Sequence, residues 1–182
     1  MSESNANTQH SFGLPDACQI RLAQDDDLTA ITDIYNQAVA TGGSSADTTV
    51  QNIQQRSVWL HSHAPREQYP VIVVEEAGEK IAFASFSRFH PRPGYDADVE
   101  LSYYVDASHR GRGLGSALVR WGLHTARELR YDKLITVIFA DNRASMSLMK
   151  RFNFTQYGLL PQAAADSHGV HHDVAYWYQP LN

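Results

Sequence analysis

The sequence predicts an α/β domain, and three observations lead to that class. Residues 99–105 are rich in β-branched and aromatic side chains, which is typical of a strand on a half-buried surface. Residues 110–115 then place three glycines and two arginines within six positions. A helical spacing of apolar residues follows directly, because Leu114, Leu118 and Trp121 recur at three- to four-residue steps. Strand, glycine-rich turn and helix in this order form an α/β unit.

The other elements are predicted from the same two periodicities and from turn residues. Strands are expected over residues 19–23, 71–76, 81–89, 97–105, 133–139, the first part of 157–169, and 171–178. Helices are expected from residue 28 to the glycines at 42 and 43, and over about 50–63, 114–129 and 144–151. Residues 77–79 form a short turn that joins two of the strands into a hairpin.

Length and composition indicate one domain with a single core. The chain has 182 residues, of which 43% are apolar. Residues 1–18 are polar at their start and are expected to form a mobile N-terminal tail, and residues 19–182 to form a single domain. No apolar run has the length of a membrane span, and the polar start lacks the features of a signal peptide.

Charge and cysteine content exclude several classes of partner. The net charge is −5, and basic residues gather only at the glycine-rich turn. Neither nucleic acid nor an anionic membrane is therefore expected as a partner. The single cysteine, Cys18, excludes an internal disulfide and favours a reducing, cytoplasmic location.

The glycine-rich turn indicates a binding site for an anion. Glycines let the main chain approach a ligand closely, and the following helix start adds N–H donors and a favourable dipole. Arg110 and Arg112 would add charge-assisted donors to the same anion. The spacing of Gly111, Gly113 and Gly115 is not that of the dinucleotide fingerprint, and the Gly-Lys-Ser/Thr ending of a P-loop is missing. A pyrophosphate cradle and a plain tight connection both stay open.

Several ordered motifs resemble the GCN5-related N-acetyltransferase (GNAT) family. Residues 110–115 fit its Arg/Gln-x-x-Gly-x-Gly/Ala loop, which holds the pyrophosphate of coenzyme A. Residues 142–145 and 152–154 resemble its Asn-x-x-Ser and Gly-Phe segments. Residues 95–105 and 172–177 are similar to the phosphinothricin acetyltransferase branch of the family. The resemblance covers about residues 19–178.

This resemblance implies a GNAT fold, in which helices flank a mixed, mostly antiparallel sheet with a V-shaped gap for acetyl-CoA. It implies a bulge in the strand 97–105 and, near residues 103–105, a backbone N–H that polarises the thioester carbonyl. The implied acetyl-CoA-binding residues are Tyr103, Tyr104, Val105, Arg110, Gly111, Arg112, Gly113, Leu114, Gly115, Ser116, Asn142 and Ser145. Acetyl-CoA is the expected co-substrate, and no metal is expected. The family habit also implies a homodimer formed through the later strands.

The central strand carries the candidate catalytic group. Because side chains alternate along a strand, Asp98, Glu100, Ser102 and Tyr104 share one face unless a bulge intervenes. Repulsion between Asp98 and Glu100 should raise the pKa of one of them. A carboxylate of raised pKa suits removal of a proton from an ammonium group, which must be neutral to attack a thioester. Glu100 lies at the position of the branch's proposed base, with a structural or substrate-orienting role as the alternative.

The acceptor side is less well defined by the motifs. The residues expected to bind the acceptor are Phe86, Arg88, Tyr95, Asp98 and Glu100. In the resembled branch the first two helices and their connection wall the acceptor pocket. Residues 43–47 are therefore either a lid or a plain connection.

Some positions depart from the family pattern. Met149 stands where the family often carries Tyr, or His in this branch, as a proposed general acid, and a thioether cannot donate a proton. Ala97 and Asp98 replace aromatic and hydroxyl residues, so phosphinothricin itself is not the expected natural acceptor. His171 and His172 would point to opposite sides of a strand, which does not favour a metal site.

The predicted reaction is direct transfer of acetyl from acetyl-CoA to the primary amine of a small molecule, with Glu100 assisting deprotonation. The expected acceptor is an amino acid or an analogue of the phosphinothricin or methionine sulfone type. Two alternatives stay open. Met149 favours a non-catalytic acyl-CoA-binding or sensing protein, and an open acceptor groove would favour a protein or peptide N-acetyltransferase.

Overall fold

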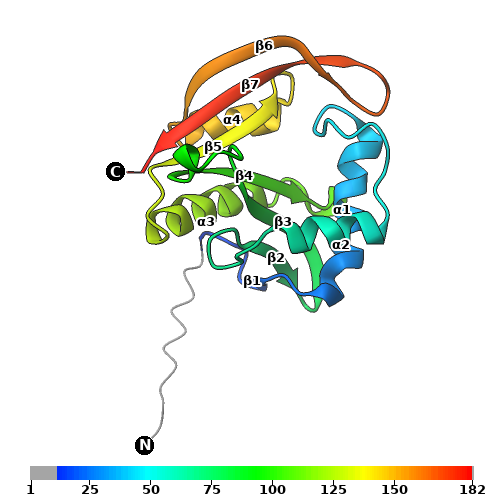
Figure 1. Cartoon of the computed structure of the whole chain (residues 1–182). Helices are drawn as coiled ribbons and strands as arrows, with labels where there is room; N and C mark the ends of the chain where they lie inside the picture. The colour runs from blue at the N-terminus through cyan, green and yellow to red at the C-terminus, as the bar shows by residue number, and fades with distance from the viewer. Residues whose placement is uncertain (1–11, 182) are drawn as a thin grey trace, which may run out of the picture.

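The computed structural model describes residues 12–181, which form one seven-stranded sheet flanked by helices (Figure 1). The strands are β1 (Cys18–Leu22), β2 (Val71–Glu76), β3 (Glu79–Arg88), β4 (Asp98–Val105), β5 (Lys133–Phe139), β6 (Thr155–Ala165) and β7 (His171–Pro180). The α-helices are α1 (Leu28–Thr41), α2 (Ile53–Ser62), α3 (Leu114–Glu128) and α4 (Arg143–Arg151). Short 3-10 helices cover Asp25–Asp27, Pro93–Tyr95 and Ala107–His109.

The sheet order is β1-β2-β3-β4-β5-β7-β6. Strands β4 and β5 run parallel, and the other neighbours run antiparallel. Helices α1 and α2 lie on one face of the sheet, and α3 and α4 lie on the other (Figure 1). This mixed, mostly antiparallel sheet between two helical layers confirms the predicted fold class.

The sequence predicted most boundaries to within a few residues, and the exceptions have local causes. Helix α2 starts at Ile53 rather than at residue 50, because Asn52 caps it. The Asn52 side chain accepts from the Gln55 backbone N–H at 2.8 Å, and the Gln55 side chain accepts from the Asn52 N–H at 2.8 Å. Strand β6 extends to Ala165, where part of a loop was expected, because its pairing with β7 resumes at Ala164 after an irregular stretch.

Residues 12–17 were expected in the mobile tail, but the structure shows them in contact with the core. Phe12 and Leu14 pack against the core cluster on the α3 side of the sheet. Arg120 of α3 donates a hydrogen bond of 2.9 Å to the Phe12 carbonyl. The rest of the predicted tail, residues 1–11, lies outside the described residues.

The central strands are buried on both faces, so two apolar clusters hold the layers together. On β2, Val71 and Val73 face the α1–α2 layer, and Ile72 and Val74 face the α3–α4 layer. Such two-sided burial gives near-continuous apolar runs rather than alternation. None of the helices within residues 12–181 has the length and hydropathy that a membrane crossing needs.

A gap opens between the two parallel strands. Strands β4 and β5 pair only through Asp98–Glu100 and Lys133–Ile135 and are unpaired beyond these residues. The β3–β4 register runs without a shift from Arg88/Val99 to Ala82/Val105, so the implied bulge is absent from this ladder. The gap therefore results from the short β4–β5 pairing, and the even-numbered side chains of β4 share one face.

Candidate active site

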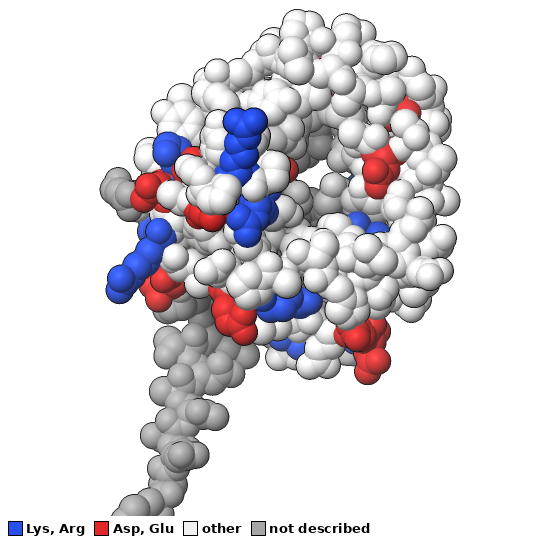
Figure 2. Space-filling model, in the orientation of Figure 1, with Lys and Arg blue, Asp and Glu red and all other residues white. Residues whose placement is uncertain are grey.

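A cavity of about 670 Å³ lies where β4 and β5 separate. Its walls come from β4, from the end of α1 and from the starts of α3 and α4. In Figure 2 the surface is hollowed between the β6–β7 hairpin and the rest of the molecule. The predicted acetyl-CoA residues that line the cavity are Tyr103, Tyr104, Val105, Arg110, Gly111, Gly113, Leu114, Gly115, Ser116, Asn142 and Ser145. We refer to it as the first cavity.

The glycine-rich turn has the backbone conformation that its sequence requires. Gly111 and Gly113 have φ angles of 77° and 85°, in the left-handed region. A Cβ atom at either position would meet no atom within 4 Å, so the requirement is conformational rather than spatial. Gly113 is the N-cap of α3, and the first N–H groups of that helix have no acceptor within the helix. Together with the Arg110 side chain, they form a suitable cradle for phosphate oxygens.

Arg112 does not contribute its side chain to this cradle. Its guanidinium forms a bidentate pair with Glu76 of β2, with one N–O distance of 2.9 Å. The prediction that both arginines bind the same anion is not matched by the position of the Arg112 side chain in this structure, because a carboxylate on a nearby strand engages it. Arg143, at the start of α4, is instead a second cation in the wall of the first cavity. Its position directly after the Asn142 cap could have indicated this.

The start of α4 supplies the opposite wall. The Asn142 side chain caps this helix by accepting from the Ser145 backbone N–H at 3.2 Å. The Tyr103 hydroxyl is buried beside Ser145, and within residues 12–181 no group forms a well-aligned hydrogen bond with it. Burial raises the pKa of Tyr103 to about 12, so the hydroxyl carries a proton that it can donate. A buried polar atom without a partner in a cavity wall fits a site whose ligand supplies the partner.

The unpaired side of β4 presents backbone donors to the gap. The Asp106 N–H donates to the Ile81 carbonyl of β3 at 2.9 Å. Because N–H directions alternate along a strand, those of Tyr103 and Val105 point to the other side, toward the gap. This geometry gives a thioester carbonyl in the gap two candidate donors, without a bulge.

A second cavity of about 310 Å³ lies on the α1–α2 face of the sheet. Its lining residues are Tyr35, Asp47, Gln51, Gln55, Arg56, Trp59, Ser85, Ser87, Ser102 and Tyr104. Tyr104 lines both cavities, so this residue lies between them. Tyr35, Arg56 and Trp59 were not predicted as site residues, because on a helix they occupy ordinary amphipathic positions.

Glu100 stands beside the second cavity. It lies directly opposite Ser87 in the β3–β4 ladder, and Ser87 lines that cavity. Burial raises the pKa of Glu100 to about 6. Repulsion from Asp98 was the expected cause, but Asp98 accepts from the Lys133 ammonium group at 3.2 Å, which neutralises its charge locally.

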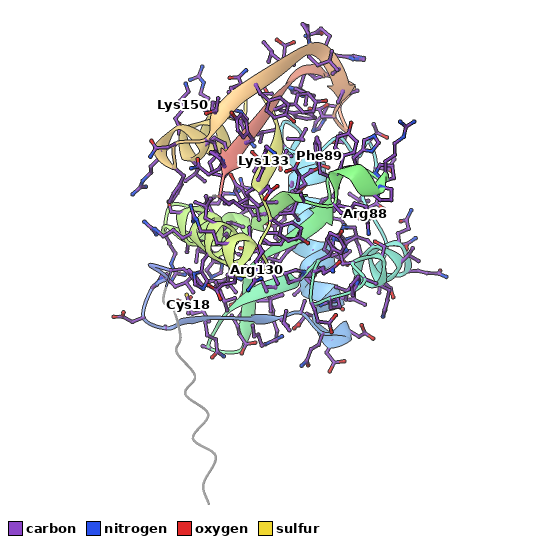
Figure 3. All side chains as sticks on the ribbon, turned by 60° about the vertical axis from the view of Figure 1, so that its left-hand side comes forward. Cys18, Arg88, Phe89, Arg130, Lys133 and Lys150 are labelled. Carbon is purple, nitrogen blue, oxygen red and sulfur yellow. The ribbon has the colours of Figure 1, made fainter. Side chains whose placement is uncertain are left out.

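None of the five predicted acceptor residues is among the lining residues of either cavity, and three of them have their contacts elsewhere. Phe86 is fully buried against Trp121 and Tyr131 on the α3 side of the sheet, because it stands opposite Leu101 rather than Glu100. Arg88 lies at the end of β3 (Figure 3) and pairs with Asp96. Tyr95 is exposed and packs on His90 with ring centroids 4.4 Å apart. The structure therefore does not bring these three residues to the cavities, and their assignment to the acceptor site stays a prediction.

Met149 occupies the core rather than the cavity. Its side chain is fully buried, and its sulfur accepts a hydrogen bond of 3.1 Å from the Thr136 hydroxyl. The position where the resembled family often carries a proton donor is therefore apolar in this chain.

The loop after α1 borders both cavities. Gly42, Gly43 and Ser44 line the first cavity, and Asp47 lines the second. The Tyr35 hydroxyl donates to Asp47 at 2.7 Å, and the Gly43 N–H donates to Asp166 at 3.2 Å. The segment predicted as a lid or a connection is thus a wall of the site, fixed to α1 and to the β6–β7 hairpin.

His172 links that hairpin to the first cavity. Its Nδ1 lies 2.8 Å from Asp141 and its Nε2 lies 3.1 Å from Asp166. Burial alone lowers the pKa of His172, but the two carboxylates outweigh it and raise the pKa overall. Within residues 12–181, no group of three or more His, Cys, Asp or Glu side chains is arranged to hold a metal ion.

Comparison with known proteins agrees with this geometry. The acetyltransferase (GNAT) family model matches residues 28–154. The Bacillus subtilis (strain 168) protein YwnH, whose name gives phosphinothricin acetyltransferase as a provisional activity, is 35% identical over 156 residues, covering 85% of this chain and 94% of that protein. An L-methionine sulfoximine/L-methionine sulfone acetyltransferase of Pseudomonas aeruginosa is 33% identical, covering 80% of this chain and 85% of that protein.

A solved structure shows the same fold with a ligand. The GNAT superfamily phosphinothricin acetyltransferase of Sinorhizobium meliloti, in complex with acetyl-CoA, superposes with a TM-score of 0.85 at 28% identity. The match covers 91% of this chain and 89% of that structure.

A sheet that opens between β4 and β5, beside a glycine-rich turn at the start of α3, is the architecture of an acyl-CoA-dependent transferase, and the chain belongs to the acetyltransferase (GNAT) family. It is an acetyl-CoA-dependent N-acetyltransferase. The relatives named phosphinothricin acetyltransferase confirm the branch that the sequence motifs indicated.

Proposed function

We propose that this enzyme acetylates the primary amine of a small amino acid or amino-acid analogue, of the phosphinothricin or methionine sulfoximine type. The observation that carries this proposal is the position of Tyr104, which lines both cavities. One cavity has the donors for acetyl-CoA, and the other is small and polar. An acceptor in the second cavity can therefore present its amine to a thioester in the first.

The residues of the chain provide each part of this reaction. When bound, acetyl-CoA supplies an electrophilic thioester carbonyl. The N–H groups of Tyr103 and Val105 stabilise negative charge on the carbonyl oxygen as the amine attacks and the C–N bond forms. Glu100 accepts the proton that the ammonium group must lose, directly or through a water. The C–S bond then breaks, and the thiolate takes up, through water, the second proton that the nitrogen loses as the amide forms, and leaves as coenzyme A.

The size of the second cavity supports a small acceptor rather than a peptide. Its volume is about 310 Å³, and α2 and the loop ending at Asp47 wall it on the side away from the sheet. A peptide acetyltransferase would need a groove open at both ends. The names of the relatives, which act on amino-acid analogues, support the same class.

We also propose a homodimer formed through the later strands. Large apolar side chains stand exposed on β6, including Tyr157, Leu159 and Leu160, each about half exposed. A contiguous exposed apolar surface of this kind is typical of an interaction site.

A thiol-release assay tests the function. Acetyl-CoA is offered with proteinogenic amino acids, methionine sulfone, methionine sulfoximine, phosphinothricin, polyamines and short peptides. We expect turnover with one of the amino-acid analogues and a lower rate with polyamines and peptides. Tight acetyl-CoA binding without turnover on any amine would instead support an acyl-CoA sensor.

Replacing Glu100 with Gln tests its role. We expect Glu100→Gln to lower kcat by about 10²- to 10⁴-fold, while the Kd of acetyl-CoA stays unchanged. In the wild type, activity should fall as the pH drops below about 6, because Glu100 with that pKa becomes protonated and can no longer accept a proton. This acidic limb should be absent in the variant. Glu79→Gln, an exposed carboxylate at the start of β3, is the matched control.

A further inference from the structure

Arg56 is a buried cation without a full set of partners. Its side chain lies on α2 and is only 5% exposed. Within the described part of the chain, its Nε and Nη2 atoms have no hydrogen-bond acceptor. Leaving charged donors unpaired inside a protein is costly, so an arrangement of this kind needs a reason.

Aromatic rings fix the plane of this guanidinium. Its central carbon lies 3.6 Å from the centroid of the Trp59 ring and 4.3 Å from that of Tyr35. These contacts stabilise the cation through its faces, but they cannot accept the N–H bonds, which lie in the plane. The side chain is thereby held between the rings, and its two edge donors are both unpaired and buried.

The two free donors form one edge of the guanidinium. Nε and Nη2 lie on the same side of the planar group, and together they match the two oxygens of a carboxylate. The carboxylate nearest in the cavity wall, that of Asp47, already accepts from the Tyr35 hydroxyl at 2.7 Å. A ligand carboxylate is the group that would complete the site.

Arg56 also lies in the cavity that Tyr104 joins to the acetyl-CoA side. In an amino acid the carboxylate and the amine are attached to one carbon atom. An acceptor whose carboxylate rests on Arg56 would therefore hold its amine within a few bonds of the same anchor. The other polar groups of this cavity include the hydroxyls of Ser85, Ser87 and Ser102, which are neutral and can bind a side chain of many kinds.

We propose that the Nε–Nη2 edge of Arg56 binds the α-carboxylate of the acceptor in the second cavity. The inference rests on the proposed function, and it narrows the acceptor to amines that carry an adjacent carboxylate. Amines without that group, such as polyamines, leave the guanidinium unpaired and are poor acceptors.

Two acceptors that differ only in this group test the inference. L-methionine sulfone is compared with its decarboxylated amine, 3-(methylsulfonyl)propylamine, in wild type, Arg56→Gln and Arg56→Lys. We expect Arg56→Gln to lower kcat/KM for the amino acid by about 10- to 100-fold, as for the loss of charged hydrogen bonds. The value for the amine should change by less than about threefold, and the KM of acetyl-CoA should stay constant. Arg56→Lys should be intermediate, because an ammonium keeps the charge without the planar edge.

The controls separate recognition from folding. Arg127→Gln makes the same chemical change on an exposed part of α3 and should alter neither acceptor. Thermal unfolding of each variant shows whether it is folded. If Arg56→Gln is not folded, Arg56→Lys takes its place in the comparison of the two acceptors. An equal loss for both acceptors would overturn the inference, and so would a wild type that does not distinguish them.

A binding experiment tests the role of Arg56 even if the proposed function is wrong. If the wild type turns over neither acceptor, the acetyl-transfer proposal fails for this acceptor class. Calorimetric titration of L-methionine sulfone into wild type and Arg56→Gln then still tests the carboxylate site. Equal affinity, or no binding to the wild type, would overturn the assignment of Arg56, and weaker binding to the variant would support it.

Discussion

The two cavities that meet at Tyr104 are built by different means. The first uses the main chain, with N–H groups from β4 and from the starts of α3 and α4, and glycines that set the turn. The second uses side chains from two helices, two strands and a loop. A backbone site can hold the same ligand with many different side chains, whereas a side-chain site changes its ligand when one residue changes. Binding of the acetyl donor should therefore tolerate side-chain substitutions in the first cavity. Binding of the acceptor should be sensitive to substitutions in the second cavity.

The cavities also share a property. Among the described residues, each cavity has a buried polar side chain that lacks well-aligned hydrogen bonds, which is Tyr103 in the first and Arg56 in the second. Both groups are left for a ligand to satisfy. The experiments below alter the first cavity, and the Arg56 variants alter the second, so the KM of each substrate reports on its own cavity.

Among the changes to the first cavity, the largest effect is expected from the turn. In Gly113→Ala, a side chain is placed at a φ of 85°, which costs about 1–2 kcal/mol and should shift the N–H groups that follow. We expect the KM of acetyl-CoA to rise about tenfold or more, with the KM of the acceptor unchanged. Steady-state kinetics with each substrate varied in turn provides the measurement.

Gly78→Ala is the matched control for that variant. Gly78 has a φ of 86° and open space around its Cβ position, but it lies in the β2–β3 turn. It should lose similar stability without any change in the KM of acetyl-CoA. Equal changes in KM for the two variants would show that strain alone, and not the cradle, explains the effect.

A smaller effect is expected from the cradle arginines. Arg110→Gln removes a cation from the first cavity and should raise the KM of acetyl-CoA about fivefold, more strongly at low salt. Arg112→Gln removes a partner of Glu76 outside the cavity and should change that KM by less than about twofold. Initial rates at two ionic strengths distinguish the pair. The reverse order of effects would mean that Arg112 leaves Glu76 when the ligand binds.

The smallest effect is expected from Tyr103. In Tyr103→Phe the buried hydroxyl without a well-aligned hydrogen bond is removed, so the ligand-free protein should be unchanged or more stable by up to about 1 kcal/mol. The affinity for acetyl-CoA should fall about threefold, because the ligand loses one hydrogen bond. Thermal unfolding and calorimetry measure the two quantities. A less stable variant with unchanged affinity would show that the hydroxyl serves the fold instead.

The difference between a site built from the backbone and one built from side chains also explains which residues could be predicted from the sequence. Gly111 and Gly113 follow a fixed spacing because the turn conformation requires glycine there. A motif of this kind can be recognised from the sequence alone. The strands and helices were equally visible, since their apolar periodicities report local structure. The family, the fold and most of the residues that line the first cavity were therefore predictable from the sequence.

The residues around the second cavity could not be predicted in this way, because that cavity depends on contacts between segments that are distant in the sequence. Phe86 and Arg88 lie close to Glu100 across the ladder, yet the alternation of side chains turns Phe86 to the opposite face. Arg112 could not be assigned without knowing that Glu76 lies beside it. Arg56 becomes notable only when its burial and its unpaired donors are seen together.

The separation of β4 from β5 has a wider consequence. A strand with free N–H and C=O groups is an edge, and exposed edges invite pairing with other chains and aggregation. Beyond Glu100 the β5 side of β4 is such an edge, but it lies inside the sheet, with strands on both sides. A strand of another protein would have to enter between β4 and β5 to reach this edge. A slender, extended ligand can enter there. The unpaired N–H and C=O groups of β4 are therefore accessible to a small molecule but not to a strand of another polypeptide.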